Sequence, residues 1–185
     1  MANIFGNLFN RISTSNVKAS AKSAFTWLKG KAKEVSAGKR TSHSVMRPEI
    51  GKMYFFSYDP KHKETLPYYD VYPLIFMVDS AKGGFFGINL HYLHPRQRAV
   101  LMDALYDLVS DEKYDRKTRL KLSYNILKST RKFKLFNPAF KRYLWKHVKS
   151  NFIEIESIEW NNAMMLPLEQ FKKASKNKVW SDSSK

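Results

Sequence analysis

The fold is decided by residues 51–93, which read GKMYFFSYDPKHKETLPYYDVYPLIFMVDSAKGGFFGINLHYL. This segment holds eleven aromatic residues, and its four basic side chains are balanced by four acidic ones. The whole chain, in contrast, has a formal net charge of +17. An apolar and electrically balanced segment inside a strongly basic chain is expected to form the core, with the flanking segments as surface.

The first half of this segment favours extended structure. Residues 51–60 place large aromatic side chains in close succession and end at an Asp-Pro pair, which is typical of a half-buried strand that leads into a turn. Pro67 and Pro73 then exclude a helix between them.

The second half predicts two strands and the turn that joins them. Residues 74–78 form an apolar run of strand length, and residues 85–93 read as the next strand. Gly83, Gly84 and Gly87 would allow a tight turn and a bend in the sheet. We therefore expect an α+β fold with a small, strongly bent antiparallel β-sheet or SH3-like barrel, flanked by basic helices and preceded by a helical arm.

Length and composition limit the class of protein. A chain of 185 residues supports one core domain, and we assign residues 50–175 to it, residues 1–49 to a basic helical arm with a linker, and residues 176–185 to a polar basic tail. The absence of cysteine excludes disulfides and thiolate metal sites. No apolar run is long enough to span a bilayer, so no membrane partner is expected.

The N-terminal arm contains two amphipathic patterns. Residues 2–12 predict a short, weak helix, and residues 17–37 predict a longer helix with lysines mostly opposite its apolar face. Such a basic helix can dock on a partner, contact phosphates or lie on a membrane, and we favour docking. The apolar residues predicted to dock on a neighbouring protein are Phe5, Leu8, Phe9, Phe25 and Leu28.

Three helices and one strand are predicted after the aromatic segment. The helices cover a stretch that begins near Pro95 and includes Leu108, residues 115–128, and a stretch that begins near Pro138. The alternation over residues 152–158 predicts an edge or returning strand. Asp103, Asp107 and Asp111 repeat every four residues; we interpret them as a solvated helix face in preference to a metal-binding row.

Positive charge is concentrated in residues 113–149, which carry thirteen Lys/Arg and one acidic residue, Asp115. The cations are interleaved with aromatic side chains, most of which we expect to be core. Lysine and arginine neutralise phosphates, and an exposed aromatic ring can stack on an unpaired base. The predicted DNA-contacting residues are Lys117, Lys121, Lys128, Arg131, Lys132, Lys134, Lys141, Arg142 and Lys146.

Catalytic and base-reading motifs are weak. His91 and His94 lack an adjoining acid or third ligand and are interpreted as core or surface residues. Residues 83–87 lack the Lys and Ser/Thr of a P-loop. We therefore expect no enzyme, no metal and no cofactor, and we expect any DNA contact to be made to backbone or to an end.

The chain resembles the DNA end protector family, whose members are head-completion proteins of T-even-type tailed phages. The resemblance covers most of residues 50–175 and is carried by GxMYFFxYDPK (51–61), LPYYDxxPL (66–74), GFxGINLHYL (84–93), LMDALY (101–106), TRLKLSY (118–124) and LPLEQF (166–171). It implies a virion protein that binds the end of packaged double-stranded DNA at the portal and neck, protects it, and completes the head for tail joining.

Several hypotheses remain open at this point. The resemblance implies portal, neck or tail proteins as partners. It also implies a location at the head–tail junction of the virion, and in the host cytoplasm during assembly. A ring-like homo-oligomer is compatible with this location. The alternative is a structural neck, tail or baseplate protein whose basic face contacts acidic virion subunits in place of DNA. A nuclease ranks third.

Overall fold

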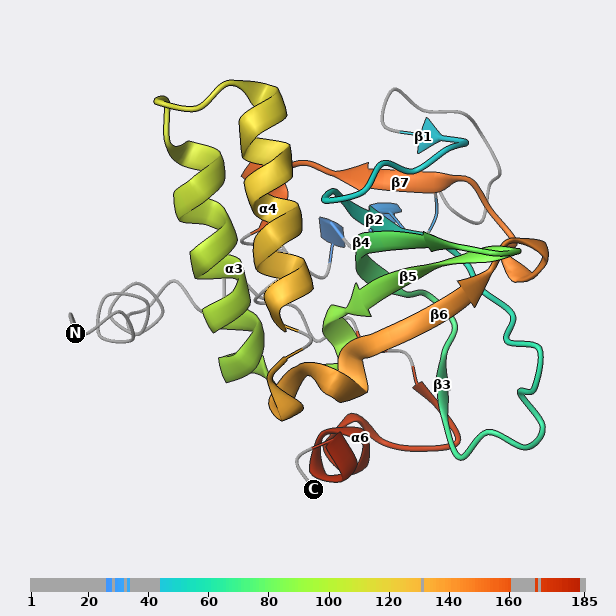
Figure 1. Cartoon of the computed structure of the whole chain (residues 1–185). Helices are drawn as coiled ribbons and strands as arrows, with labels where there is room; N and C mark the ends of the chain where they lie inside the picture. Colours follow the sequence, from blue (N-terminus) through green and yellow to red (C-terminus); the bar gives the residue numbers. More distant parts are fainter. Residues whose placement is uncertain are drawn as a thin grey trace.

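The computed structural model describes residues 26–27, 29–31, 33, 44–130, 132–160, 169 and 171–183. Within these residues the chain forms an α+β fold, with one large antiparallel sheet, two long helices packed beside it, and a short C-terminal helix (Figure 1). The predicted docking residues Phe5, Leu8, Phe9, Phe25 and Leu28 lie outside the described residues, as does Arg131.

The large sheet has the strand order β1-β7-β2-β4-β5-β6, and all of its pairs are antiparallel. Its strands are β1 (Ser44–Val45), β2 (Met53–Phe55), β4 (Leu74–Ala81), β5 (Gly84–Asn89), β6 (Phe140–Leu144) and β7 (Phe152–Ile155). The predicted antiparallel sheet is thus confirmed, but the alternative of a closed barrel is wrong, because the two ends of the sheet, β1 and β6, do not pair within the described residues.

The hairpin between β4 and β5 follows the predicted glycine chemistry. Gly83 has φ +72°, in the left-handed region that the tight turn requires. Gly84 lies so close to β6 that a Cβ there would meet the Tyr143 carbonyl oxygen at 2.0 Å. The predicted turn and both of its strands are confirmed, and β4 extends to Ala81, beyond the predicted end at Val78. The second strand is shorter than predicted, because residues 90–92 form the 3₁₀ helix η1 (Leu90–Tyr92), which the Asn89 side chain caps.

Side chains on the two faces of the sheet form two hydrophobic clusters. One cluster lies beneath the helices and joins Phe76 and Ile88 to Leu105 and Leu127. The other lies on the opposite face, where Phe56 contacts the rings of its neighbours from β5, β6 and β7. Alternation along the strands sends successive side chains to opposite faces, which is why a neutral aromatic segment can fill both clusters.

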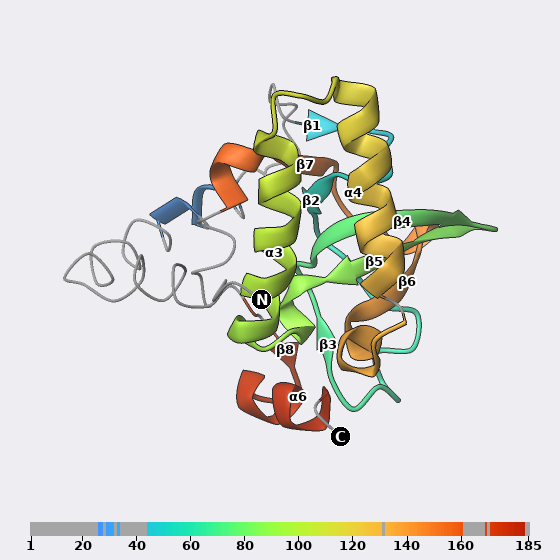
Figure 2. The ribbon, with the colours of Figure 1, turned by 60° about the vertical axis from the view of Figure 1, so that its left-hand side comes forward.

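The helices α3 (Pro95–Ser110) and α4 (Arg116–Thr130) confirm two predicted helices within a few residues at each end. Pro95 occupies the first turn of α3, where its missing N–H is not needed, and the His94 side chain caps the helix together with Gln97. Figure 2 shows α3 and α4 side by side, covering one side of the sheet.

The third predicted helix is wrong. Residues 134–139 form the 3₁₀ helix η2 (Lys134–Ala139), and residues 140–144 form the edge strand β6, followed by η3 (Trp145–His147). Apolar residues at helical spacing misled the prediction here, because pairing with β5, distant in sequence, overrides a local pattern. The predicted strand over residues 152–158 is present as β7, but it returns between β1 and β2 and is not at the edge.

Two terminal segments pack against this body. In the N-terminal arm, the described residues 26–27, 29–31 and 33 are helical, and Lys31, predicted on the solvated side, is buried and pairs with Glu159 at 3.0 Å. Glu159, in η4 (Ser157–Glu159), also accepts a hydrogen bond from Trp27 at 2.7 Å. At the other end, β8 (Phe171–Lys172) pairs with β3 (Tyr69–Asp70), and α6 (Lys176–Ser183) buries Val179.

Candidate nucleic-acid interface

Helix α4 presents a row of exposed lysines. Its sequence, RKTRLKLSYNILKST, holds five cations and no carboxylate. Lys117, Lys121 and Lys128 are all exposed, and at 3.6 residues per turn they lie within about 40° of one another around the helix axis. Tyr124 lies in the same row, with Lys128 Nζ 5.5 Å from its ring centre. We call Lys117, Lys121, Tyr124 and Lys128 the α4 lysine row.

The acidic residue nearest in sequence to this row, Asp115, caps the N-terminus of α4. Asp115 accepts a hydrogen bond from the Thr118 backbone N–H at 2.7 Å, as an N-terminal cap does. That bond is the main reason why the pKa of Asp115 is lowered, so the carboxylate stays ionised at the positive end of the helix dipole. The lysine row is therefore not neutralised from within its own helix.

Two more predicted residues follow at the end of α4. Lys132 and Lys134 are exposed, and Phe133 between them leaves 60% of its surface exposed. Of the aromatics between residues 113 and 149, Phe136 and Tyr143 are core as expected, whereas Tyr114, Phe133 and Trp145 are exposed enough to meet a base.

The remaining predicted residues lie on β6 and just after it, and the structure divides them. Arg142 is exposed and donates a hydrogen bond to the Lys82 carbonyl at 2.9 Å, and Lys146 is exposed in η3. Lys141 shares the strand face of Tyr143, whose ring belongs to the cluster opposite the helices. The predicted residues that the structure describes therefore do not form one exposed surface, because Lys141 is half-buried and packs over Tyr92, whereas the others are exposed.

Lys141 lines a cleft of about 630 Å³ between β6 and the loop that precedes β3. Its Nζ lies 3.9 Å from the centre of the Tyr92 ring, a close cation–π contact. Burial lowers the pKa of Lys141 to about 8, because the cation has lost much of its water. The lining residues are Tyr58, Pro60, Lys61, His62, Leu66, Pro67, Tyr68, Tyr69, Asp70, Asn89, Tyr92, Lys141, Arg142, Tyr143 and Leu144. We call this the Lys141 cleft.

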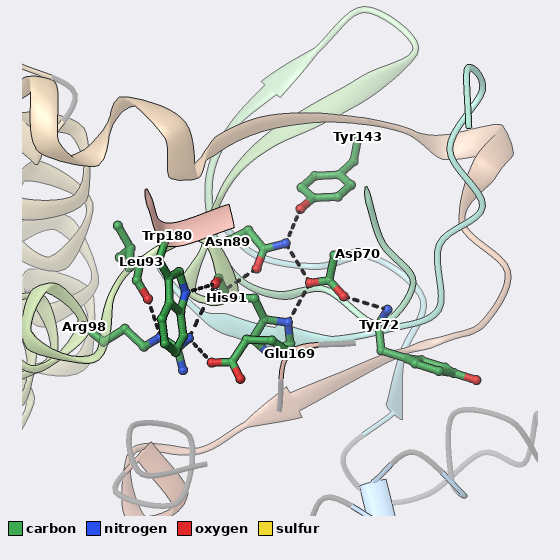
Figure 3. Close-up of polar contacts among 9 residues, drawn as sticks. All are labelled: Asp70, Tyr72, Asn89, His91, Leu93, Arg98, Tyr143, Glu169 and Trp180. Carbon is green, nitrogen blue, oxygen red and sulfur yellow. Dashed lines mark hydrogen bonds and ion pairs between the residues drawn. The ribbon is translucent and has the colours of Figure 1, made fainter. Parts of the chain in front are cut away.

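A buried polar network forms the floor of the cleft (Figure 3). Asp70 Oδ2 lies 2.6 Å from His91 Nδ1 and accepts a hydrogen bond from Asn89 Nδ2 at 3.0 Å, while Asp70 Oδ1 accepts one from the Tyr72 backbone N–H at 3.1 Å. Asn89 Nδ2 also donates to the Tyr143 hydroxyl at 3.1 Å. His91 is thus a core residue, as expected, although its neighbouring acid comes from a distant segment.

A second buried group supports this floor from behind. The Arg98 side chain, 1% exposed, forms an ion pair with Glu169 and donates from Nε to the Leu93 carbonyl at 2.9 Å. The Trp180 indole donates to the His91 carbonyl at 3.0 Å, so α6 closes over the same turn (Figure 3). These contacts fix the turn between β5 and α3 that carries Tyr92.

Sequence reasoning missed the floor and its support, namely Asp70, Asn89, Tyr92, Arg98 and Glu169. Their side chains meet only through pairing of segments far apart in the chain, which no local spacing reveals. Asn89 and His91, polar residues inside an apolar strand, were the available signal, because a buried polar side chain requires a partner.

Other types of site find no support in the described residues. No group of three or more His, Cys, Asp or Glu side chains there could hold a metal ion. Nor does any described helix have the length and apolar character needed to cross a membrane.

Fold and surface together define a small basic α+β protein with one solvated row of lysines and one desolvated lysine in a cleft. The family described as phage T4 terminal DNA protecting protein matches the chain over residues 1–183. The chain belongs to this family of phage proteins, which confirms the resemblance and extends it into the N-terminal arm. A search of curated proteins and a search of solved structures each gave no match.

Proposed function

We propose that this protein binds the ends of double-stranded phage DNA and shields them from exonucleases, without catalytic activity of its own. Membership of the terminal DNA protecting family supports the activity, and the α4 lysine row is the observation that carries it. Lysines on an acid-free helix neutralise phosphates irrespective of base sequence, which suits a protein that must bind any genome end.

We further propose a place in the virion at the portal and neck, where the bound end completes the head for tail joining. Exposed Phe133 and Trp145, close in sequence to Lys132, Lys134 and Lys146, would contact the terminal base pair, which has one face without a stacking partner. The N-terminal arm would then dock on the portal, neck or tail subunits.

Protection of linear DNA tests this function directly. The full chain, added to a linear duplex at a slight excess over ends, should delay digestion by an exonuclease that starts at duplex ends and should leave endonuclease nicking of a closed circle unchanged. Affinity should fall steeply with salt. Unchanged exonuclease digestion together with a flat salt response would refute the proposal.

The same preparation separates the two other hypotheses. An assembly protein that contacts only acidic subunits should stay bound to virion proteins after exhaustive nuclease treatment and should not protect DNA. A nuclease would degrade the linear duplex when magnesium is added and no other enzyme is present.

A further inference from the structure

The Lys141 cleft holds a cation without an anion. Lys141 Nζ packs over the Tyr92 ring, and no hydrogen bond or ion pair joins this nitrogen to a carboxylate among residues 44–130, 132–160, 169 and 171–183. A desolvated ammonium group is costly unless an opposite charge approaches it. The cleft therefore favours an anionic ligand, and the lowered pKa of Lys141 agrees with this geometry.

The charged groups around Lys141 leave room for such an anion. Asp70, the carboxylate in the lining, is 4% exposed, and its two oxygens already take three partners in the floor network. Burial raises the pKa of Tyr92 and Tyr143, so both phenols stay neutral. The remaining lining residues that can carry a positive charge, Lys61, His62 and Arg142, are exposed. The other tyrosines of the lining are Tyr58, Tyr68 and Tyr69, and burial also raises the pKa of Tyr58 and Tyr68.

Size and chemistry point to a nucleotide at the end of a strand. A cleft of about 630 Å³ is of the size that holds one small ligand, and a duplex cannot enter it. Tyr68 and Tyr69 are half-buried in its wall, and such rings stack on bases without regard to sequence. A terminal phosphate carries close to two negative charges, more than the single charge of an internal phosphodiester, so it gains most from a desolvated lysine.

We propose that the Lys141 cleft binds the terminal phosphate of one DNA strand, with the last unpaired nucleotide against the tyrosine wall. This inference rests on the proposed function and adds recognition of a chemical feature that only an end possesses. The α4 lysine row would hold the duplex, and the cleft would distinguish an end that carries a phosphate from one that carries a hydroxyl.

The test uses a DNA hairpin with one open end and a three-nucleotide overhang. The overhang is prepared as a 5′ or a 3′ extension, and each carries either a terminal phosphate or a hydroxyl. Fluorescence anisotropy with the full chain measures the four affinities at one salt concentration. We expect a preference of about tenfold for the phosphate on one of the two extensions, the usual size of a charge-assisted contact. That result would also identify the strand polarity.

Variants assign the preference to the cleft. Lys141→Met should bring the phosphate-to-hydroxyl ratio to about one, and Lys141→Arg, which keeps the charge, should retain most of it. Lys121→Gln, an exposed lysine of the α4 row, should weaken binding to both ends by the same factor. Melting curves show that each variant is folded.

The outcomes separate this inference from the function on which it rests. Equal affinity of the unmodified protein for phosphate and hydroxyl ends, with exonuclease protection intact, would overturn the cleft proposal alone. A preference that persists in Lys141→Met would overturn it as well. If the unmodified protein neither binds DNA ends nor protects them from exonuclease, the proposed function itself is overturned.

Discussion

The α4 lysine row and the Lys141 cleft use the same side chain in opposite physical settings. Lys117, Lys121 and Lys128 are exposed to solvent on a helix, where salt screens their charges. Lys141 is packed over the Tyr92 ring in a cleft beside the edge strand β6, where burial lowers its pKa to about 8. The first setting provides affinity for any phosphate, whereas the second is able to discriminate between phosphates.

The difference also concerns stability. An exposed lysine costs the folded state almost nothing, and its contribution to DNA binding follows from the counterions that it releases. A desolvated lysine reduces stability in the unbound protein, and an anionic ligand offsets that cost. Charged groups whose desolvation reduces stability are common at functional sites.

The largest expected effect comes from the support behind the cleft. Glu169→Ala leaves the buried Arg98 guanidinium without its carboxylate, and breaking a buried ion pair in this way costs about 3–5 kcal/mol of unfolding free energy. Denaturant unfolding measures this loss. Because Arg98 holds the turn that carries Tyr92, the phosphate preference should also decrease, while salt-dependent binding through α4 should persist below the melting temperature.

An exposed pair supplies the control for that variant. Lys178 and Asp182 form an i,i+4 pair at 3.0 Å on α6, and Asp182→Asn should change the unfolding free energy by less than about 0.5 kcal/mol. A similarly small effect of Glu169→Ala would show that the buried ion pair with Arg98 does not support the cleft.

The next effect isolates the α4 lysine row. Affinity falls as salt rises, so the slope of log affinity against log salt is negative. Replacing Lys117, Lys121 and Lys128 together by Gln should reduce the magnitude of this slope by about 2.7, or about 0.9 per lysine. Between 50 and 200 mM salt the unmodified protein should then lose roughly 40-fold more affinity than the triple variant. Anisotropy titrations at four salt concentrations give both slopes.

Lys178→Gln is the matched control, because it removes one exposed lysine from a different face of the protein. It should leave the slope unchanged. If it lowers the slope as much as each α4 substitution does, the binding depends on overall net charge and not on the row.

The smallest expected effect is a gain in stability. Lys141→Met removes a desolvated charge. A lysine pKa lowered from 10.5 to about 8 corresponds to a cost of roughly 3 kcal/mol in the folded state, which the substitution removes. The substitution also removes the cation–π contact with Tyr92, which costs about 1–2 kcal/mol of stability. The net gain in unfolding free energy should be about 1–2 kcal/mol at pH 7. Thermal melting of the two proteins measures it.

The pH dependence of this gain has a definite sign. Between about pH 8 and 10.5 the unfolded chain holds the Lys141 proton more tightly than the folded chain, so the unmodified protein recovers stability as pH rises. The difference between the two proteins should be complete below pH 8 and disappear near pH 10.5. Tyr92 and Tyr143, with raised pKa values, do not ionise in this window. A difference that stays constant with pH would show that charge is not its cause.

Local patterns in the sequence were sufficient for much of the fold. The β4–β5 hairpin and helices α3 and α4 were predicted because apolar spacing, glycine and a proline at the first turn are local signals. Strand β6 was predicted as a helix because its strand character depends on β5, more than fifty residues earlier in the chain. Long-range pairing of this kind leaves no signature within a short window.

The candidate site divides in the same way. The α4 lysine row could be predicted, because an acid-free basic helix is visible in the sequence itself. Lys141 was also named, but as one more surface cation. Its cleft could not be predicted, since Asp70, Asn89, Tyr92 and Lys141 come together only through pairing of segments up to about seventy residues apart.

Helix α6 has a consequence for biosynthesis. Residues 176–183 are translated after every other described element, yet Trp180 donates to the His91 carbonyl and Val179 is fully buried. While the ribosome still encloses these residues, the turn that carries Tyr92 lacks its cover, although α3 and α4 precede α6 by more than forty residues in the chain. The nascent chain therefore presents its lysine row to nucleic acid before its cleft has taken its final shape.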